Sequence, residues 1–125
     1  FCLVPLGRFF EPCWETGKAV PWSIHRQDGE PFTVAGIWDR WNDRATGEIV
    51  VSFSMLTINA DGHPIMGRFH RPGDERRSLV VVPRRAWHDW LAATPCTASS
   101  MLSEMPVDQF TSEEAGTAKP QLGLL

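Results

Sequence analysis

The feature that most constrains the fold is a series of short apolar, β-branched and aromatic runs separated by turn residues. The strand-like runs are residues 2–5, 8–10, 20–26, 31–38, 49–58 and 79–82. Turn signals lie at 17–18, 28–29 and 43–47, and the Asp-Gly pair at 28–29 is a strong signal for a two-residue hairpin. These runs predict a chain built mostly from antiparallel strands.

The segment 53–82 contains the end of one run, the start of another and, between them, a dense group of polar side chains. The first run ends near Thr57, and the second begins at Leu79. Between them lie a polar turn, His63-Pro64 and the cluster Arg68-Phe69-His70-Arg71. A scaffold commonly presents functional groups on such an excursion between strands. If the protein performs chemistry, we expect His70 to take part.

The expected fold class is α+β, with a mostly antiparallel, curved and barrel-like sheet flanked by helices. Pro83 suits the first turn of a helix in which Ala86, Trp87, Trp90 and Leu91 recur at helical spacing. A second, weaker amphipathic segment covers 99–105. We expect residues 1–110 to be the C-terminal portion of a longer domain, because the chain starts within a strand-like run, and 111–125 to be a loose tail.

Composition narrows the classes of function. The net charge of −3 argues against a general nucleic-acid-binding protein but leaves room for a local basic patch. The chain lacks an apolar run of membrane-spanning length, so a cytoplasmic monomer without membrane contact is expected. The three cysteines show no paired spacing and the four histidines no metal-binding spacing, so neither a disulfide framework nor a metal or other cofactor is expected. Most of the six tryptophans should line the core or a pocket.

Glu11 is the first candidate for a catalytic group. It follows two phenylalanines and precedes Pro12-Cys13-Trp14. Burial among such neighbours would raise the pKa of the carboxyl group and suit it to proton transfer near neutral pH. The alternative is that Glu11 points outward into water while Phe10 points inward, and the sequence leaves both open.

His70 is the second candidate, because arginines surround it in the sequence. An imidazole in this position can act as a base or a hydrogen-bond partner, and the planar guanidinium groups suit phosphate. The alternative is a solvated loop histidine. His63, before Pro64, is expected to be a turn residue. The arginines that we expect to contact a phosphate backbone are Arg68, Arg71, Arg76 and Arg77.

The order and spacing of several motifs resemble the SRAP family, the SOS response-associated peptidases, also described as abasic-site processing proteins. The matching stretches are Arg8-Phe9-Phe10-Glu11, Asp28-Gly29-Glu30-Pro31-Phe32, Ala35-Gly36-Ile37-Trp38, Leu56-Thr57, Asn59-Ala60, His63-Pro64-Ile65-Met66, Phe69-His70, Val82-Pro83 and the Trp87-Trp90-Leu91 helix. They cover about the first three-quarters of the chain.

This resemblance implies a sensor of abasic sites in single-stranded DNA that acts in the DNA-damage (SOS) response and associates with the nucleoid. In the family, an N-terminal cysteine closes a thiazolidine with the ring-opened sugar, and a glutamate and a histidine assist the proton transfers. Glu11 matches that glutamate, His70 the histidine, and Thr57 a threonine that lines the pocket. The implied activities are formation of a covalent crosslink with DNA and lyase-like reversal of that crosslink. The protein is also implied to be a peptidase that removes its own N-terminus by hydrolysis.

Three departures from the family pattern are visible. Cys2-Leu3-Val4-Pro5 matches an internal strand and not the family's N-terminal Met-Cys-Gly-Arg, so we assign Cys2 to the core and expect the nucleophile in a part of the protein outside this chain. Without that cysteine the chain by itself is not expected to form the crosslink. Pro12 stands where the family usually has an aromatic residue, and a longer loop follows His70.

Two other classes of function remain open. A noncatalytic module that binds nucleic acid or protein could keep this fold, and it would leave Glu11 and His70 on unrelated surfaces. A hydrolase that cleaves peptides is the other class, for which self-processing is the expected limit.

Overall fold

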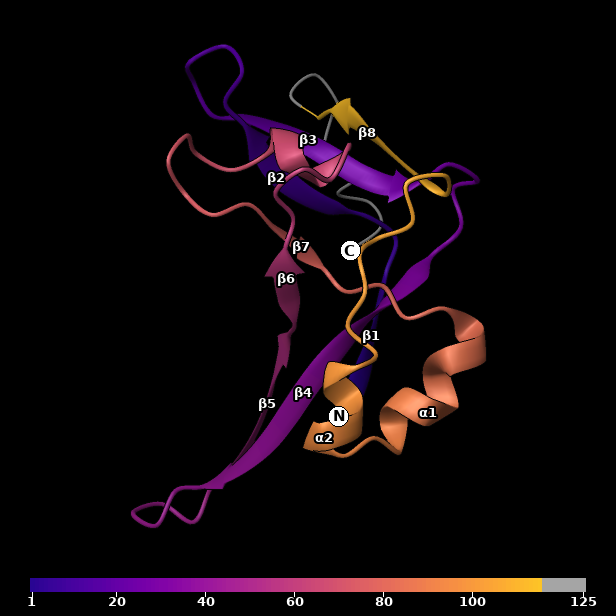
Figure 1. Cartoon of the computed structure of the whole chain (residues 1–125). Helices are drawn as coiled ribbons and strands as arrows, with labels where there is room; N and C mark the ends of the chain where they lie inside the picture. Colours follow the sequence, from indigo (N-terminus) through magenta and orange to yellow (C-terminus); the bar gives the residue numbers. More distant parts are fainter. Residues whose placement is uncertain (116–125) are drawn as a thin grey trace.

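The computed structural model describes residues 1–115, which form three antiparallel sheets and four short helices (Figure 1). One sheet has the order β1 (Cys2–Leu6), β4 (Phe32–Asn42) and β5 (Ile49–Met55). A second has the order β2 (Phe9–Cys13), β3 (Val20–Arg26) and β8 (Phe110–Glu114). The third pairs β6 (Thr57–Asn59) with β7 (Arg77–Leu79), and the helices are η1 (Met66–Arg68), η2 (Arg84–Ala86), α1 (Trp87–Leu91) and α2 (Pro95–Ser99).

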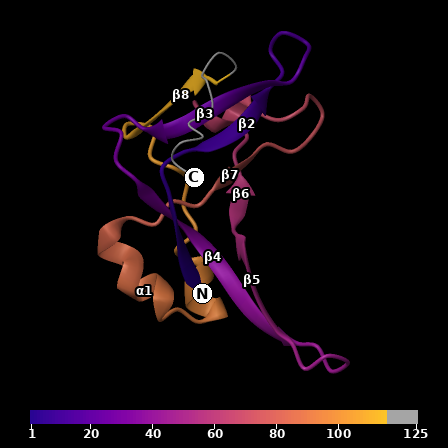
Figure 2. The same ribbon diagram turned by 180° about the vertical axis from the view of Figure 1, so that it is seen from behind.

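The α+β class and the antiparallel pairing are confirmed, whereas barrel-like closure is not. Within residues 1–115 the strands form three separate sheets. Isolated bridges tie β2 to Phe69 through Cys13, and β4 to Val81 through Val34. Figure 2 shows β4 and β5 leaving the body of the molecule as a long two-stranded ribbon. None of the helices in residues 1–115 has the length and apolar character needed to cross a membrane.

The hairpin predicted at 28–29 is wrong, although the turn itself is present. Gly29 adopts a φ of +76°, and its N–H donates to the carbonyl of Arg26 at 3.0 Å. The Asp28 carboxylate accepts from the Glu30 backbone at 2.9 Å and pairs with the Arg26 guanidinium, so these local contacts hold the turn by themselves. The strands on either side therefore separate, and β3 and β4 enter different sheets.

The longest predicted strand, 49–58, is divided in the structure. The ladder with β4 ends at Met55, and β6 then pairs with β7 from Thr57. Between them the Leu56 N–H donates to the carbonyl of Ala35 at 2.9 Å. This change of partner carries the chain from the protruding ribbon into the region that contains the His70 loop.

The predicted loose tail is wrong for residues 111–114, which belong to strand β8. This strand pairs along β3 from Trp22–Glu114 to Arg26–Phe110. Phe110 is buried and packs edge-to-face on Phe32, with 4.9 Å between ring centroids. Burial of this one aromatic ring explains why a polar segment is held as a strand. The remainder of the expected tail, 116–125, lies outside the described residues.

The second helix begins earlier than the sequence predicts. The observed α2 covers Pro95–Ser99, and the predicted segment was 99–105. Thr94 caps the helix, because its side chain accepts from the Thr97 N–H while the Thr97 hydroxyl accepts from the Thr94 N–H. Pro95 occupies the first turn, where its missing N–H costs nothing.

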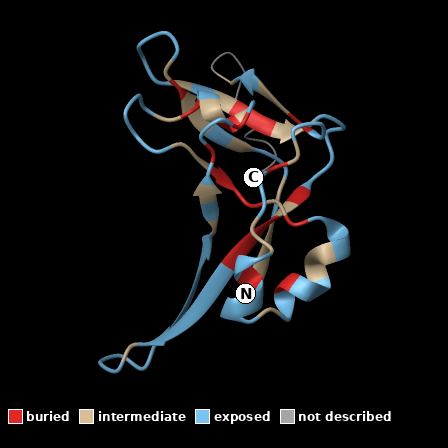
Figure 3. Cartoon of the chain, in the orientation of Figure 1, coloured by how far each residue is buried: buried red, intermediate tan, exposed pale blue. Residues whose placement is uncertain are grey.

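The buried residues, coloured red in Figure 3, form two clusters. The first cluster lies beneath the β2–β3–β8 sheet and includes Ile24, Phe32, Phe69 and Phe110. The second lies where β1 and β4 meet the α1–α2 segment and centres on Trp90, whose indole N–H donates to the Cys2 carbonyl at 2.8 Å. The expectation for the tryptophans is confirmed for Trp90, for Trp22 and Trp87, which pack on the two clusters, and for Trp38, which lines a hollow beside β1. It is wrong for Trp41, which is more than half exposed on the ribbon.

Candidate active site

Strand β2 places Glu11 on the inward face of its sheet. Two residues away on either side, Phe9 packs against the first cluster and Cys13 belongs to it, so Glu11 shares their face of the strand. Glu11 faces Trp22 in the register with β3, and its side chain is half-buried. The outward alternative is therefore excluded, and it is Phe10 that points into water, with 56% of its surface exposed.

Two backbone contacts bring His70 to the end of the same strand. Phe69 is fully buried and bridges Cys13, and the His70 N–H donates to the carbonyl of Pro12 at 3.0 Å. His70 has a φ of +76° and, among residues 1–115, is the one non-glycine residue in that region. A conformation of this kind carries a cost of order 1–3 kcal/mol, and it is commonly kept where a side chain must point in a required direction.

The two candidate side chains face each other. Nδ1 of His70 lies 3.7 Å from Oε2 of Glu11, and both side chains are largely shielded from water. On the other edge of the ring, Nε2 lies 2.9 Å from the carbonyl oxygen of Arg77. A carbonyl oxygen can only accept, so Nε2 carries a hydrogen, and Nδ1 is the ring nitrogen that faces Glu11.

Burial raises the pKa of the Glu11 carboxyl group above its ordinary value of 4.5, and the nearby His70 partly opposes the rise by favouring the carboxylate. Desolvation is the larger of the two effects. A carboxyl group held in this way keeps its proton to a higher pH than an exposed glutamate does. Together with Nδ1 of His70, it forms a pair of groups that can exchange protons with a substrate at the same place.

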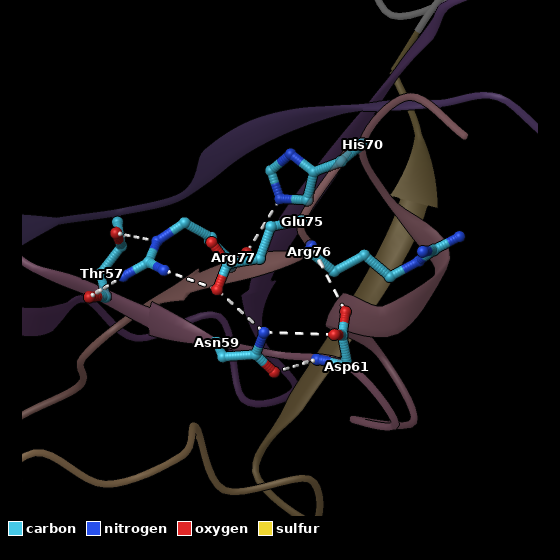
Figure 4. A network of polar contacts seen from close by, with 7 residues as sticks. All are labelled: Thr57, Asn59, Asp61, His70, Glu75, Arg76 and Arg77. Atoms are coloured by element: carbon cyan, nitrogen blue, oxygen red, sulfur yellow. Dashed lines mark hydrogen bonds and ion pairs between the residues drawn. The ribbon is translucent and has the colours of Figure 1, made fainter. Parts of the chain in front are cut away.

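A network of hydrogen bonds holds the far side of His70 in place (Figure 4). Arg77 donates from Nε to Oγ1 of Thr57 at 2.8 Å and from Nη2 to the Thr57 carbonyl at 2.7 Å. Its Nη1 contacts Oε1 of Glu75 at 2.9 Å, and the same oxygen accepts from the amide of Asn59. Thr57 is thus linked to His70 through Arg77, which supplies the carbonyl that orients the imidazole ring.

The four predicted arginines differ in what they contact. Arg68 donates to Glu15 at 2.7 Å and lies over the Trp22 ring, with 4.6 Å between its Cζ atom and the ring centroid. Arg76 donates to the carbonyl of Gly67 at 2.5 Å. Arg77 is engaged in the network above, and Arg71 lies over the Trp14 ring at 5.7 Å. Their predicted role in contacting DNA stays a prediction.

Cys2 and His63 have structural positions, Cys13 is buried, and Cys96 is exposed. Cys2 belongs to β1, and a Cβ atom on Gly36 would come within 2.9 Å of its sulfur, so the thiol fills the space that glycine leaves. His63 is buried and not just a turn residue: its Nε2 donates to the Met105 carbonyl at 2.8 Å, while Nδ1 accepts backbone N–H groups. No group of three potential metal ligands occurs in residues 1–115.

Several site residues were missed in the sequence. Trp22 faces Glu11 across the β2–β3 ladder, and Asn59 and Glu75 complete the network around Arg77. The turn at 17–18 indicates that the strands on either side of it pair, but a hairpin centred there would place residue 24, and not Trp22, opposite Glu11. Asn59 and Glu75 are held together by contacts across the whole loop, and a local pattern does not predict them.

Comparison with known proteins supports the resemblance. The family model described as "SOS response associated peptidase (SRAP)" matches residues 1–118. A crystal structure of a protein from Bordetella bronchiseptica superposes with a TM-score of 0.84 at 39% identity, over 90% of this chain and 53% of that one. Another, from Bacteroides thetaiotaomicron, has a TM-score of 0.75 at 24% identity, over 90% of this chain and 47% of that one, and shares the fold. No curated protein matches the sequence.

The present chain spans about half the length of these two solved structures. The family match, by contrast, extends over nearly the whole chain and includes both candidate catalytic residues, Glu11 and His70. The family's description connects it with the SOS response to DNA damage and with peptidases. This chain belongs to the SRAP family.

Proposed function

We propose that the protein recognises abasic sites in single-stranded DNA and takes part in covalent crosslinking to them. The observation that carries the proposal is the Glu11–His70 pair, in which a carboxyl group of raised pKa lies 3.7 Å from Nδ1 of an oriented imidazole. Membership of the SRAP family adds the connection with DNA damage. The proposed nucleophile is an N-terminal cysteine of the parent protein, outside residues 1–125.

The reaction needs proton transfers that this pair can perform. The hemiacetal of the abasic sugar opens when a base removes the proton of its hydroxyl group and an acid protonates the ring oxygen. The amine of the cysteine then adds to the aldehyde and water leaves, which again requires a proton donor. Addition of the thiolate to the imine carbon, with a proton taken up by nitrogen, closes the thiazolidine, so that aldehyde and aminothiol yield thiazolidine and water.

In this proposal Glu11 supplies the proton to each leaving oxygen, and His70 accepts a proton through Nδ1 and relays it. Reversal uses the same groups in the opposite order, because a step and its reverse pass through the same transition state. Thr57 and Arg77 act indirectly, since they hold the carbonyl that orients His70. The protein acts on DNA as a monomer in the cytoplasm and needs no cofactor or metal.

The test follows crosslink formation and reversal on a denaturing gel, with the parent protein and a single-stranded oligonucleotide that carries one abasic site. Glu11→Gln should slow reversal by about 10²-fold or more while leaving binding of undamaged DNA nearly unchanged. His70→Ala should lower both crosslink yield and reversal. The exposed Glu30, converted to Gln, is the matched control. Equal reversal rates for Glu11→Gln and the parent would remove Glu11 from the chemistry.

The noncatalytic alternative requires Glu11 and His70 on unrelated surfaces, and their 3.7 Å separation does not favour it. A peptidase remains a second candidate, because the family's description names that activity. We rank self-processing above cleavage of other proteins. The intact mass of the parent protein carrying Glu11→Gln provides the test. Retention of the residues before the N-terminal cysteine in this variant would support self-processing.

A further inference from the structure

The arginines near His70 provide different amounts of free positive charge. Glu15 neutralises Arg68 through a 2.7 Å contact, and Glu75 neutralises Arg77 through a 2.9 Å contact. Arg76 is partly buried and has its Nε committed to the Gly67 carbonyl. A phosphate group that approached Arg68 or Arg77 would have to displace a carboxylate that is already in place.

Arg71 differs from these three. It is exposed, and within residues 1–115 its guanidinium has neither a carboxylate partner nor a hydrogen bond. Its contact is with Trp14, whose ring centroid lies 5.7 Å from Cζ. A cation–π contact of this kind restricts where the guanidinium lies, and its N–H groups stay free to donate.

The backbone holds Trp14 and Arg71 beside the candidate active site. The Cys13–Phe69 bridge and the hydrogen bond from His70 N–H to the Pro12 carbonyl fasten the end of β2 to the loop. Trp14 follows Cys13 directly, and Arg71 follows His70 directly. Trp14 and Arg71 therefore each lie one residue beyond a backbone contact that holds Glu11 and His70 together.

We propose that Arg71 is a phosphate subsite for an unpaired DNA strand next to the Glu11–His70 pair, and that Trp14 is the positioning residue that holds its guanidinium in place. The proposal rests on the proposed function and extends it by naming one contact. Arg71 donates two N–H groups to a phosphate oxygen pair, and Trp14 limits the orientations that the long side chain would otherwise sample. The role arises from the loop that follows His70, so it belongs to this chain's own sequence.

The chain also contains a matched control. Arg84 lies over the Trp87 ring at 5.5 Å, which is a similar distance, but the pair belongs to η2 and α1 and not to the segments that carry Glu11 and His70. Arg84→Ala removes the same charge and the same kind of cation–π contact with a tryptophan ring. Any effect that depends only on net charge will appear in both variants.

The experiment measures binding of a fluorescently labelled oligothymidylate, without abasic sites, to the parent protein by anisotropy at several salt concentrations. Arg71→Ala should weaken binding about tenfold at low salt and reduce the slope of log affinity against log salt by about 0.7. Trp14→Ala should have a smaller effect in the same direction, and Trp14→Phe, which keeps an aromatic face, should restore most of the affinity. Arg84→Ala should leave both affinity and slope nearly unchanged.

Two outcomes would overturn the proposal: unchanged affinity and slope in Arg71→Ala, or equal losses in Arg71→Ala and Arg84→Ala. Far-ultraviolet circular dichroism of each variant excludes misfolding, and Arg71 is exposed, so its variant is expected to fold. Failure of the proposed function would look different, because the oligothymidylate assay involves no chemistry. A parent protein that binds this probe through Arg71 but forms no crosslink with abasic DNA would refute the crosslinking alone.

Discussion

The candidate active site and the outer half of the β4–β5 ribbon have opposite relations to water. The side chains of Glu11 and His70 are largely shielded from water, and each contacts a partner within 3.7 Å. On the ribbon, large apolar side chains are exposed, with 53% of Trp38 and 61% of Phe53 in contact with solvent. Trp38 and Phe53 are cross-strand partners, so their side chains lie on the same face of the sheet.

The difference arises from what covers each sheet face, and not from strand composition. The inward face of β2 is covered by Phe69 and by the loop that carries His70, so even a carboxyl group there loses water. Beyond Gly36 the side chains from Ile37 to Asn42 are all exposed, and the inner end of the ribbon shares an open hollow with β1 at Trp38 and Phe53. An exposed apolar patch of this kind commonly marks a contact surface or a tendency to associate.

The largest expected effect separates the two regions by their contribution to stability. Phe69→Ala should lower the free energy of unfolding by about 3–5 kcal/mol, because this fully buried ring leaves a cavity. Phe53→Ala should cost less than about 1 kcal/mol, because most of that ring is already in water. Urea unfolding of both variants checks the comparison, and similar losses would show that the ribbon face is covered in solution.

An intermediate effect is expected from Arg77, which joins β6 to β7 and orients His70. Arg77→Ala removes the contacts to Thr57 and Glu75 and should cost about 1–2 kcal/mol, since these groups are partly exposed and water replaces some of the lost hydrogen bonds. Urea unfolding gives the value. Arg40→Ala on the ribbon is the control, and equal changes in the two variants would mean that the network adds nothing to stability.

The smallest effect is a dependence of stability on pH. Because the folded-state pKa of Glu11 is raised, the folded protein binds that proton more tightly than the unfolded chain does. The stability contributed by Glu11 is therefore present below pH 4.5 and is lost as pH rises from 4.5 through the raised pKa. Glu11→Gln has no such proton, so its stability relative to the parent should increase across this window.

Glu75→Gln should change stability with pH in the opposite direction from Glu11→Gln in the same measurement. Hydrogen bonds from Asn59 and Arg77 lower the pKa of Glu75, so its contribution is present above pH 4.5 and is lost as pH falls through the lowered pKa. Thermal unfolding between pH 3 and pH 8 compares both variants with the parent. If stability relative to the parent varied in the same direction for both, the assigned environment of Glu11 would be wrong.

Much of the strand content was predictable, whereas the pairing was not. The runs at 20–26 and 31–38 and the helix after Pro83 follow from local patterns, and the structure contains an element at each. The Asp28–Gly29 turn, however, separates two sheets, and Phe110 carries a polar segment into β8. Both results depend on contacts between distant residues, such as Phe32 with Phe110, which periodicity does not encode.

The candidate site was predictable residue by residue but not as an arrangement. Glu11 was recognised from its aromatic neighbours and His70 from its arginine-rich surroundings. For both residues, however, an outward, solvated position was the alternative. Their mutual orientation depends on the Cys13–Phe69 bridge and on the positive φ of His70. The partners of the arginines, which separate Arg71 from Arg68 and Arg77, likewise arise from side chains brought in by other segments.

By itself the sequence determined that this is a mostly β chain of the SRAP family, because strand periodicity, turn residues and motif order are properties of neighbouring residues. Only the tertiary structure decided that Glu11 faces His70, that Trp38 stays in water and that β8 completes a sheet. The physical reason is that an alternating strand has two faces, and the burial of each face depends on which distant segment packs over it.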